Sequence, residues 1–364
     1  MQMKSECGVL FFVSPPASTL TERRYKRSKE SSPPRGPISP SSTFDFQTSR
    51  IFLFLISRRW RQVGGPRRSA PYRPPTLPLS FSAFQLFSIY LPMDFTIVTA
   101  SYNYGHYIGE CLQSVAAQEG VSFEHLVMDA GSKDDTAEVV ARFPHASLFQ
   151  EPDKGMSDGI NKGFRRATGK WVMWLNADDR LKPGALKAVK EFAEMNPDAD
   201  VIHGGWDYID REGKFIRRMP AIPFDFRILV QQGCYIGSTA CFYRRETTIA
   251  EGHLLDIDFG FCMDGEYYAR LAHFGKRFVY LPEVLADFRL HGESISQKSL
   301  GKDDVKNVLR MQRQAAEPRA IRRIYGIKPF KDENLSLVVD GILYHVYRLK
   351  KGMLRAMYGR KTKG

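Results

Sequence analysis

Cysteine is scarce in this 364-residue chain and is not arranged for metal or redox chemistry. The five residues are Cys7, Cys111, Cys234, Cys241 and Cys262, and no two have the spacing of a zinc site or a dithiol centre. We therefore expect free thiols in a reducing compartment. Long hydrophobic runs are missing from the first 92 residues, because the stretches 51–56 and 79–91 fall short of the roughly 20 residues that span a bilayer. The opening residues also lack a secretory pattern.

The net charge of +13 suggests a nucleic-acid binder, but the charge is not spread evenly. Residues 1–92 carry 14 basic and 4 acidic side chains, residues 93–300 carry 23 and 30, and residues 301–364 carry 16 and 6. The central part is therefore acidic and lies between two basic flanks. This distribution argues against a basic face across a folded core, so we expect no nucleic-acid partner.

Residues 1–92 are rich in proline, serine and arginine, with 12 of the 21 prolines, and show neither helical nor strand periodicity. Such a composition buries too little apolar surface to offset the entropy of folding, so we expect a disordered extension. A strand pattern starts abruptly at Met93. Two explanations stay open: Met93 is the natural start, or residues 1–92 are a targeting segment of the transit type. Mass spectrometry of the native N-terminus distinguishes them.

From Met93 onwards, short apolar runs alternate with segments of helical period. The pattern predicts strands at 95–100, 123–128, 147–150 and 171–175, and helices at 108–118, 137–143, 160–167 and 183–195. It further predicts a hairpin over 206–218, strands at 238–244 and 284–290, and a helix from Asp264. Such alternation indicates an α/β fold with a mostly parallel sheet. Ligands bind such sheets at the carboxyl ends of the strands.

Polar residues follow the first two predicted strands. Thr99, Ser101 and Asn103 could hold a nucleoside, although hydroxyl and amide side chains there also serve as helix caps. Asp129 ends the second strand, where a carboxylate can accept hydrogen bonds from a base or ribose. Capping accounts for the later aspartates, Asp134 and Asp135, but not for Asp129.

Two further segments suit a phosphate-bearing ligand and its cation. Asp153-Lys154-Gly155 and Asn161-Lys162-Gly163 flank a helix start, where lysines can meet phosphate; a solvated loop is the alternative. Asn176-Ala177-Asp178-Asp179 follows the 171–175 strand. Adjacent carboxylates there suit Mg²⁺ or Mn²⁺, whereas a capping role explains only Asp179.

Taken in order, these motifs resemble the family 2 glycosyltransferases of the GT-A (Rossmann-like) fold, over residues 94–298. The resemblance rests on TASYN, DAGSKDDT, PDKGMSDGINKG, ATGKWVMWLNADD, MDGEYYARL and FRLHGESIS. It implies an enzyme that moves a sugar from a nucleotide-sugar donor to an acceptor hydroxyl, usually with inversion and a divalent metal. The PDKG…NKG…NADD segment is most similar to enzymes that build bacterial surface polysaccharides.

The resemblance also assigns roles to particular residues. It places Thr99, Ser101, Asn103 and Asp129 at the nucleoside. It makes Asp178 and Asp179 the carboxylates for metal and diphosphate, with His291 in reach of either. It makes Asp264 the general base, with Arg270 nearby and Glu266 in reserve. Ala130 and Asn176 stand where many members have aspartates. The first departure weakens a case for uridine; the second leaves an amide oxygen as a ligand.

We divide the chain into an extension (1–92), a GT-A domain (93–300) and a basic helical region (301–364). Apolar residues at helical spacing and many basic residues share positions 335–358, which suggests a helix. That helix could lie on an anionic membrane surface or pack on the domain. We expect a cytoplasmic glycosyltransferase, peripheral at the inner face of the membrane, with a sugar or lipid-linked glycan as acceptor. The alternative is a non-catalytic scaffold that binds nucleotide-sugar.

Overall fold

The computed structural model describes residues 93–291, 316–326, 333–359 and 362 of the chain. The predicted extension at 1–92 lies outside the described residues. So do residues 292–300, at the end of the predicted catalytic domain, and several of the basic residues near the C-terminus.

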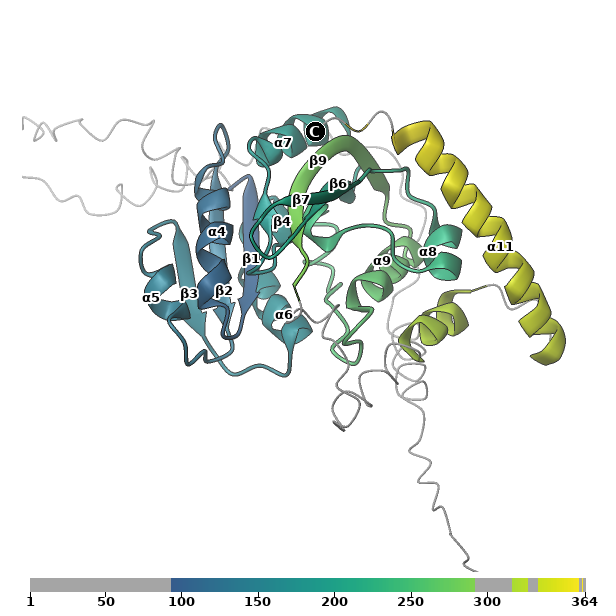
Figure 1. Ribbon diagram of the computed structural model, residues 1–364, viewed down its shortest axis with the longest axis horizontal. Helices are drawn as coiled ribbons and strands as arrows, with labels where there is room; N and C mark the ends of the chain where they lie inside the picture. The colour runs from purple at the N-terminus through teal and green to yellow at the C-terminus, as the bar shows by residue number, and fades with distance from the viewer. Residues whose placement is uncertain (1–92, 292–315, 327–332, 360–361, 363–364) are drawn as a thin grey trace, which may run out of the picture. The chain divides into compact units, whose positions relative to one another are not determined.

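Nine strands form one sheet in the order β3-β2-β1-β4-β8-β6-β9-β5, with β7 paired to β6 (Figure 1). They are β1 (Phe95–Ser101), β2 (Phe123–Asp129), β3 (Ala146–Gln150), β4 (Trp171–Trp174), β5 (Arg180–Leu181), β6 (Val201–Ile209), β7 (Phe215–Met219), β8 (Cys241–Arg244) and β9 (Phe278–Arg289). The α-helices with individual labels are α4 (Gly105–Ala116), α5 (Thr136–Val140), α6 (Met156–Arg166), α7 (Ala185–Met195), α8 (Phe226–Gln232), α9 (Met263–His273) and α11 (Glu333–Tyr358). Residues 316–325 are also helical.

The first half of the sheet has the parallel pairing that the sequence predicts. β3, β2, β1 and β4 are parallel neighbours, and their connections each contain a helix. The second half is mixed, because β8 pairs antiparallel with both β4 and β6, while β6 and β9 are parallel. The α/β prediction is thus confirmed, with the antiparallel pairs confined to the half that contains the hairpin.

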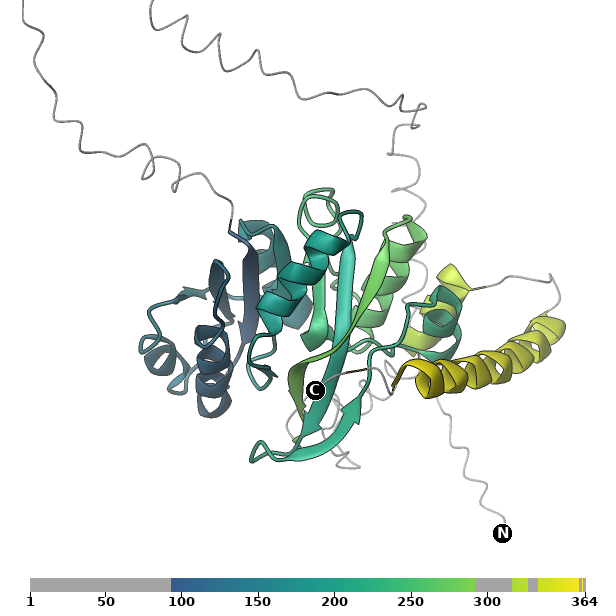
Figure 2. The ribbon, with the colours of Figure 1, turned by 90° about the horizontal axis from the view of Figure 1, so that it is seen from above.

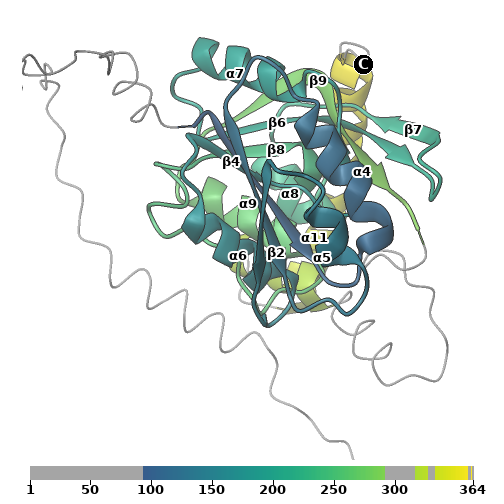
Figure 3. The same cartoon turned by 90° about the vertical axis from the view of Figure 1, so that its left-hand side faces the viewer.

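Opposite faces of β1 and β4 bury different sets of side chains. Phe95 and Met173 join one apolar core with residues from α4 and α7. On the other face, Trp174 packs with Phe164 of α6 and Tyr267 of α9, at ring-centroid distances of 5.9 and 6.2 Å. Figure 3 shows α4 and α6 on opposite sides of the sheet. Helices on both faces therefore hold the strand ends in place.

One glycine lets α6 approach the sheet closely. A Cβ atom on Gly163 would lie 2.3 Å from a methyl carbon of Val98 on β1, so any larger side chain would push the helix outward. The same helix begins beside the carboxyl ends of the strands. The close packing at Gly163 therefore helps to fix where the segment before α6 meets the strand ends.

Most predicted elements occur with small shifts in their ends. The predicted 160–167 helix begins earlier, at Met156, and the predicted 183–195 helix begins at Ala185. The hairpin is β6 and β7, with Gly213 at φ 85° in its turn. The predicted 238–244 strand was partly wrong, because residues Ser238–Ala240 form a 3₁₀ turn before β8. Among the helices of the described residues, none is both long and apolar enough to cross a membrane.

The C-terminal part of the chain packs on α8. Lys350 forms an ion pair with Asp225, which caps α8, and the Lys351 ammonium lies 5.2 Å from the centre of the Tyr235 ring. The Gln232 amide donates a hydrogen bond to the Tyr344 carbonyl. Helix α11 accordingly runs beside α8 (Figures 1 and 2).

Candidate functional site

A cavity of about 650 Å³ opens at the carboxyl ends of β1 and β4. Its walls come from the segments that follow the strands, from the start of α6 and from the loop that leads into α9. A volume of this size fits a drug-sized ligand, and this end of an α/β sheet is where such ligands bind. It is therefore the candidate active site.

Five residues proposed from the sequence line this cavity together. They come from four separate segments of the chain, one of which carries both Asn176 and Asp178: Ser101, Asp153, Asn176, Asp178 and Asp264. The hydroxyl oxygen of Ser101 and the side-chain amide oxygen of Asn176 are buried and have no hydrogen-bond partner among the described residues. Buried polar atoms normally have such partners. The Ser101 hydroxyl is thus placed to donate a hydrogen bond to a ligand or accept one from it, and the Asn176 amide oxygen to accept one.

Asp178 lies at the centre of a small polar cluster. One of its carboxylate oxygens is 2.7 Å from Nε2 of His291, and both side chains are largely buried. His291 does not line the cavity itself but contacts it through Asp178. The predicted proximity of His291 to the acidic pair is therefore present in the structure.

Asp179 is directed away from the cavity. Its two carboxylate oxygens accept hydrogen bonds from the Arg289 backbone N–H, at 2.9 Å, and from the Asn176 amide, at 2.8 Å. Burial, followed by the nearby charge of Asp178, raises the pKa of Asp179 well above its usual range. In this arrangement Asp178 faces the ligand space, and Asp179 holds the residues around it.

The residues at this point fit a hard divalent cation. Among the described residues, no three His, Cys, Asp or Glu side chains cluster as a complete metal site. Mg²⁺ and Mn²⁺ sites, however, can use one or two protein carboxylates, with water and substrate phosphates as the other ligands. The Asp178 carboxylate and the unpartnered Asn176 carbonyl oxygen supply oxygen ligands on one wall of the cavity. The side-chain amide oxygen of Asn176 can therefore bind the cation in place of a carboxylate oxygen.

Asp264 lines the same cavity from the start of α9. One carboxylate oxygen accepts a hydrogen bond of 2.7 Å from the Gly265 N–H. Burial, the largest effect, raises the pKa of Asp264, and the charge of Glu317 acts in the same direction. A carboxylate with a raised pKa is a stronger base than an ordinary aspartate.

The two other acid–base candidates on α9 do not line the cavity. Glu266 is buried and forms an ion pair with Arg270, with a 2.9 Å contact, and it also accepts a hydrogen bond from the Tyr325 hydroxyl. Arg270 therefore neutralises Glu266 rather than partnering Asp264, contrary to the interpretation drawn from the sequence. Glu266 belongs to the packing of α9 against the 316–325 helix.

Three of the residues predicted at the nucleoside bind neighbouring strands or turns of the protein. Thr99 is fully buried and its hydroxyl lies 2.8 Å from Nε2 of His125. Asn103, at φ 57°, accepts a hydrogen bond from the Lys133 N–H. Asp129 accepts hydrogen bonds from the backbone N–H groups of Gly131 and Ser132, at 3.3 and 3.0 Å, and from two side chains. None of the three lines the 650 Å³ cavity.

The residues predicted for phosphate binding divide in the same way. Asp153 lines the cavity, and Lys154 is exposed beside it. Asn161 is buried and exchanges two hydrogen bonds with the backbone of Leu255, at 2.9 and 2.8 Å. The Lys162 ammonium binds the Pro152 carbonyl. Asn161 and Lys162 thus attach α6 to neighbouring loops, and neither lines the cavity.

Residues 96–252 match the sequence model described as Glycosyl transferase family 2. Known proteins of this class are similar over the same region. An uncharacterised glycosyltransferase of Nostoc sp. is 29% identical over 217 residues, which cover 55% of this chain and 66% of the relative. A PGL/p-HBAD biosynthesis glycosyltransferase of Mycobacterium bovis is 31% identical over 157 residues, 42% of this chain and 59% of the relative. The domain that contains residues 96–252 therefore belongs to the family 2 glycosyltransferases.

This chain aligns with no more than about two thirds of the length of these two relatives. Among solved structures, residues 1–349 of S. aureus TarS in complex with UDP-GlcNAc are similar, with 19% sequence identity and a TM-score of 0.47. That match covers 62% of this chain and 66% of the other. The match of residues 96–252 confirms the family identification drawn from the motifs.

Arg289 is a residue of the transferase site that the sequence did not single out. It is fully buried at the end of β9, and its guanidinium donates hydrogen bonds to the carbonyls of Asp178 and Arg211, at 2.9 and 2.7 Å. It also forms an ion pair with Glu110 of α4. Arg289 therefore fixes the backbone of the Asp178-Asp179 pair. Its only signal in the sequence was its position two residues before His291 in the FRLHG motif.

Glu317 is a second residue that the sequence missed. Its carboxylate is buried and accepts hydrogen bonds from three consecutive backbone N–H groups, those of Gly260, Phe261 and Cys262, at 3.0, 2.8 and 2.7 Å. Gly260 and Phe261 line the cavity, and Asp264 follows them. The 316–325 helix thus holds the loop that carries the candidate base of the transferase.

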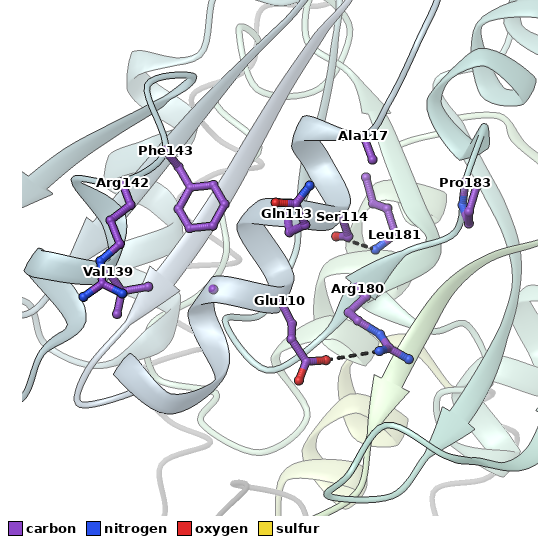
Figure 4. A pocket seen from close by; sticks show the side chains of 11 residues that line it. Glu110, Gln113, Ser114, Ala117, Val139, Arg142, Phe143, Arg180, Leu181 and Pro183 are labelled. Atoms are coloured by element: carbon purple, nitrogen blue, oxygen red, sulfur yellow. Dashed lines mark hydrogen bonds and ion pairs between the residues drawn. The ribbon is translucent and has the colours of Figure 1, made fainter.

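A second cavity, of about 550 Å³, lies between α4, α5 and the segment 180–183 (Figure 4). Its lining is mainly apolar and contains none of the residues predicted for catalysis or donor binding. At its edge Glu110 pairs with Arg180, and Ser114 accepts a hydrogen bond from the Leu181 N–H. Glu110 also contacts Arg289. Through Glu110, the edge of this second cavity is linked to Arg289, which holds the backbone of Asp178.

Proposed function

We propose that this enzyme transfers a sugar from a nucleotide-sugar to an acceptor hydroxyl, with inversion at the anomeric carbon and with Mn²⁺ or Mg²⁺. The observation that carries the proposal is the 650 Å³ cavity in which Asp178 and Asp264 stand on different walls. The Asp178 carboxylate has the side-chain amide oxygen of Asn176 beside it, and the Asp264 carboxylate has a raised pKa. A transferase of this kind needs a cation at the departing diphosphate and a base at the acceptor hydroxyl.

The donor would occupy the side of the cavity formed by the ends of β1 and β4. The Ser101 hydroxyl and Asp153 would bind polar groups of the nucleotide, and the Asp178 and Asn176 oxygens would hold the cation. A bound divalent cation would offset the negative charge that develops on the departing nucleoside diphosphate. Thr99, Asn103 and Asp129 would act by shaping the turns that the nucleoside contacts.

Asp264 would act on the acceptor side. The attacking hydroxyl must lose its proton as its oxygen bonds to the anomeric carbon, and a suitably placed carboxylate can accept that proton. Attack from the face opposite the leaving diphosphate inverts the anomeric centre. Asp264 and Asp178 line one cavity from different elements, the start of α9 and the segment after β4, which supports separate roles for the two carboxylates.

The acceptor is proposed to be a sugar of a growing polysaccharide or a lipid-linked glycan. The similar mycobacterial protein is named for PGL/p-HBAD biosynthesis, and the PDKG…NKG…NADD segment resembles enzymes of surface polysaccharides. The free thiols among the described residues, Cys111, Cys234, Cys241 and Cys262, support a cytoplasmic location.

A thermal-shift panel of nucleotide-sugars, each with and without Mn²⁺, tests the donor proposal. Ligands that bind the folded state raise its melting temperature. We expect one nucleotide class to raise it, and to raise it further with Mn²⁺ than without. The enzyme should also hydrolyse that donor slowly when no acceptor is present. If no nucleotide-sugar shifts the melting temperature under either condition, the proposed donor class is wrong.

The pH dependence of transfer tests the base. Because burial raises the pKa of Asp264, its carboxylate takes up a proton at a higher pH than an ordinary aspartate, whose pKa is about 3.9. Only the ionised form can accept a proton, so the rate should fall as pH falls through the raised pKa. A pH–rate profile with the donor found above measures this limb. A rate that stays constant down to the ordinary aspartate pKa would argue against Asp264.

A further inference from the structure

An unusual apolar stripe runs along the solvent-exposed side of α11. Six large hydrophobic residues recur at spacings of three or four positions, and each is 51–71% exposed: Val338, Ile342, Val346, Leu349, Met353 and Met357. At 100° per residue they occupy a sector of about 100° on the helix. A helix that only packs on a domain turns such a stripe inward.

The opposite side of α11 is the side that contacts the domain. Lys351 lies over the ring of Tyr235, and the ring of Tyr358 is 5.7 Å from that of Tyr280. Leu343 and Leu354, which belong to the same side, are less exposed than the stripe. The packing prediction for this helix is therefore incomplete. The helix does contact the domain, but its apolar stripe remains uncovered.

The charge along the helix favours one kind of partner. Between Gly341 and Tyr358 there are four basic residues and no acidic one. Lys350 is exposed about 20° beyond one edge of the stripe, and Arg348 is exposed about 80° beyond the other edge. An apolar stripe bordered by arginine and lysine is typical of helices that lie in the plane of an anionic membrane surface. From Val338 to Met357 it spans about 29 Å at 1.5 Å per residue.

We propose that α11 is an interfacial helix that attaches the enzyme to an anionic lipid bilayer through this stripe. The six apolar side chains enter the boundary between headgroups and acyl chains, and the exposed Arg348 and Lys350 contact lipid phosphates. The domain stays on the aqueous side, because its contacts with α11 use the other side of the helix. The proposal concerns attachment and is independent of the transfer reaction.

Vesicle flotation tests this attachment with the full chain. We expect wild-type protein to float with vesicles of phosphatidylcholine and phosphatidylglycerol, and much less with phosphatidylcholine alone. The double variant Leu349→Glu/Met353→Glu should bind anionic vesicles at least about tenfold more weakly, since it removes two apolar side chains that would be buried in the bilayer. The variant Arg348→Gln, which removes the exposed arginine nearer the stripe, should weaken the preference for anionic lipid.

The matched control is Met195→Glu. Met195 is 72% exposed on α7, away from α11, so this variant adds a charge at an equally exposed methionine and should bind vesicles as wild type does. Melting temperature and donor-induced thermal shift should be unchanged in all variants. Equal flotation of wild type and the stripe double variant would overturn the proposal. The proposal would also be overturned if wild-type protein does not bind vesicles but forms a dimer, and the same double variant dissociates that dimer.

Discussion

Changing Asp264 to Asn should lower the rate of sugar transfer by about 10²–10⁴-fold, the usual range for losing a general base. The amide keeps the size of the side chain and can still accept the Gly265 N–H, so the start of α9 should keep its form. It cannot take the proton of the acceptor hydroxyl. Steady-state kinetics with the identified donor should show the loss in kcat, with donor affinity by thermal shift little changed.

The folded state provides a control for this variant. Because the pKa of Asp264 is raised in the folded protein, its ionisation opposes folding as pH rises through the values between the unfolded and folded pKa. Asn removes that opposition, so Asp264→Asn should be at least as stable as wild type near neutral pH. Glu266→Gln is the matched comparison: it weakens the buried pair with Arg270 and should lower the melting temperature. Near-normal turnover in Asp264→Asn would remove Asp264 from the mechanism.

The strand and helix pattern of residues 93–291 could be predicted because it is local. The apolar runs that become β1, β2 and β4 are buried on both faces, and such strands appear in sequence as continuous hydrophobic segments. The parallel order of the first four strands follows from their helical connections. The antiparallel insertion of β8 between β4 and β6 depends on long-range pairing, which periodicity does not encode.

The candidate site was predictable in part for a similar reason. Residues that follow strands must gather at one edge of the sheet, which brought Ser101, Asn176 and Asp178 into one cavity. Sequence position alone does not tell which of two adjacent carboxylates turns outward, and Asp179 turns inward. The positioning roles of Arg289 and Glu317 arise from contacts across more than 50 residues of chain, so no local motif announces them.

Changing Asp178 to Asn should remove the Mn²⁺-dependent part of the donor-induced thermal shift and lower the transfer rate by about 10²–10³-fold. Asp178 is the acidic residue of the Asp178-Asp179 pair that faces the cavity, and its replacement leaves amide oxygens without a charge. A neutral oxygen set holds a hard divalent cation more weakly than one with a carboxylate. Thermal shifts with the nucleotide-sugar, with and without Mn²⁺, measure the first effect, and steady-state kinetics measure the second.

The neighbouring change, Asp179→Asn, separates a charge effect at the ligand from a general disturbance of the loop. The new amide can accept the Arg289 N–H, but its nitrogen then faces the nitrogen of Asn176, so one buried hydrogen bond is lost. The loss of one such bond costs about 1–3 kcal/mol of folding free energy. Removing the charge of a buried carboxyl whose pKa is raised offsets this cost near neutral pH. Asp179→Asn should therefore keep a Mn²⁺-dependent shift with little net change in melting temperature, whereas Asp178→Asn should lose that shift. If both variants lose stability and keep the Mn²⁺ effect, the cation is held elsewhere, and Asp178 has only a structural role.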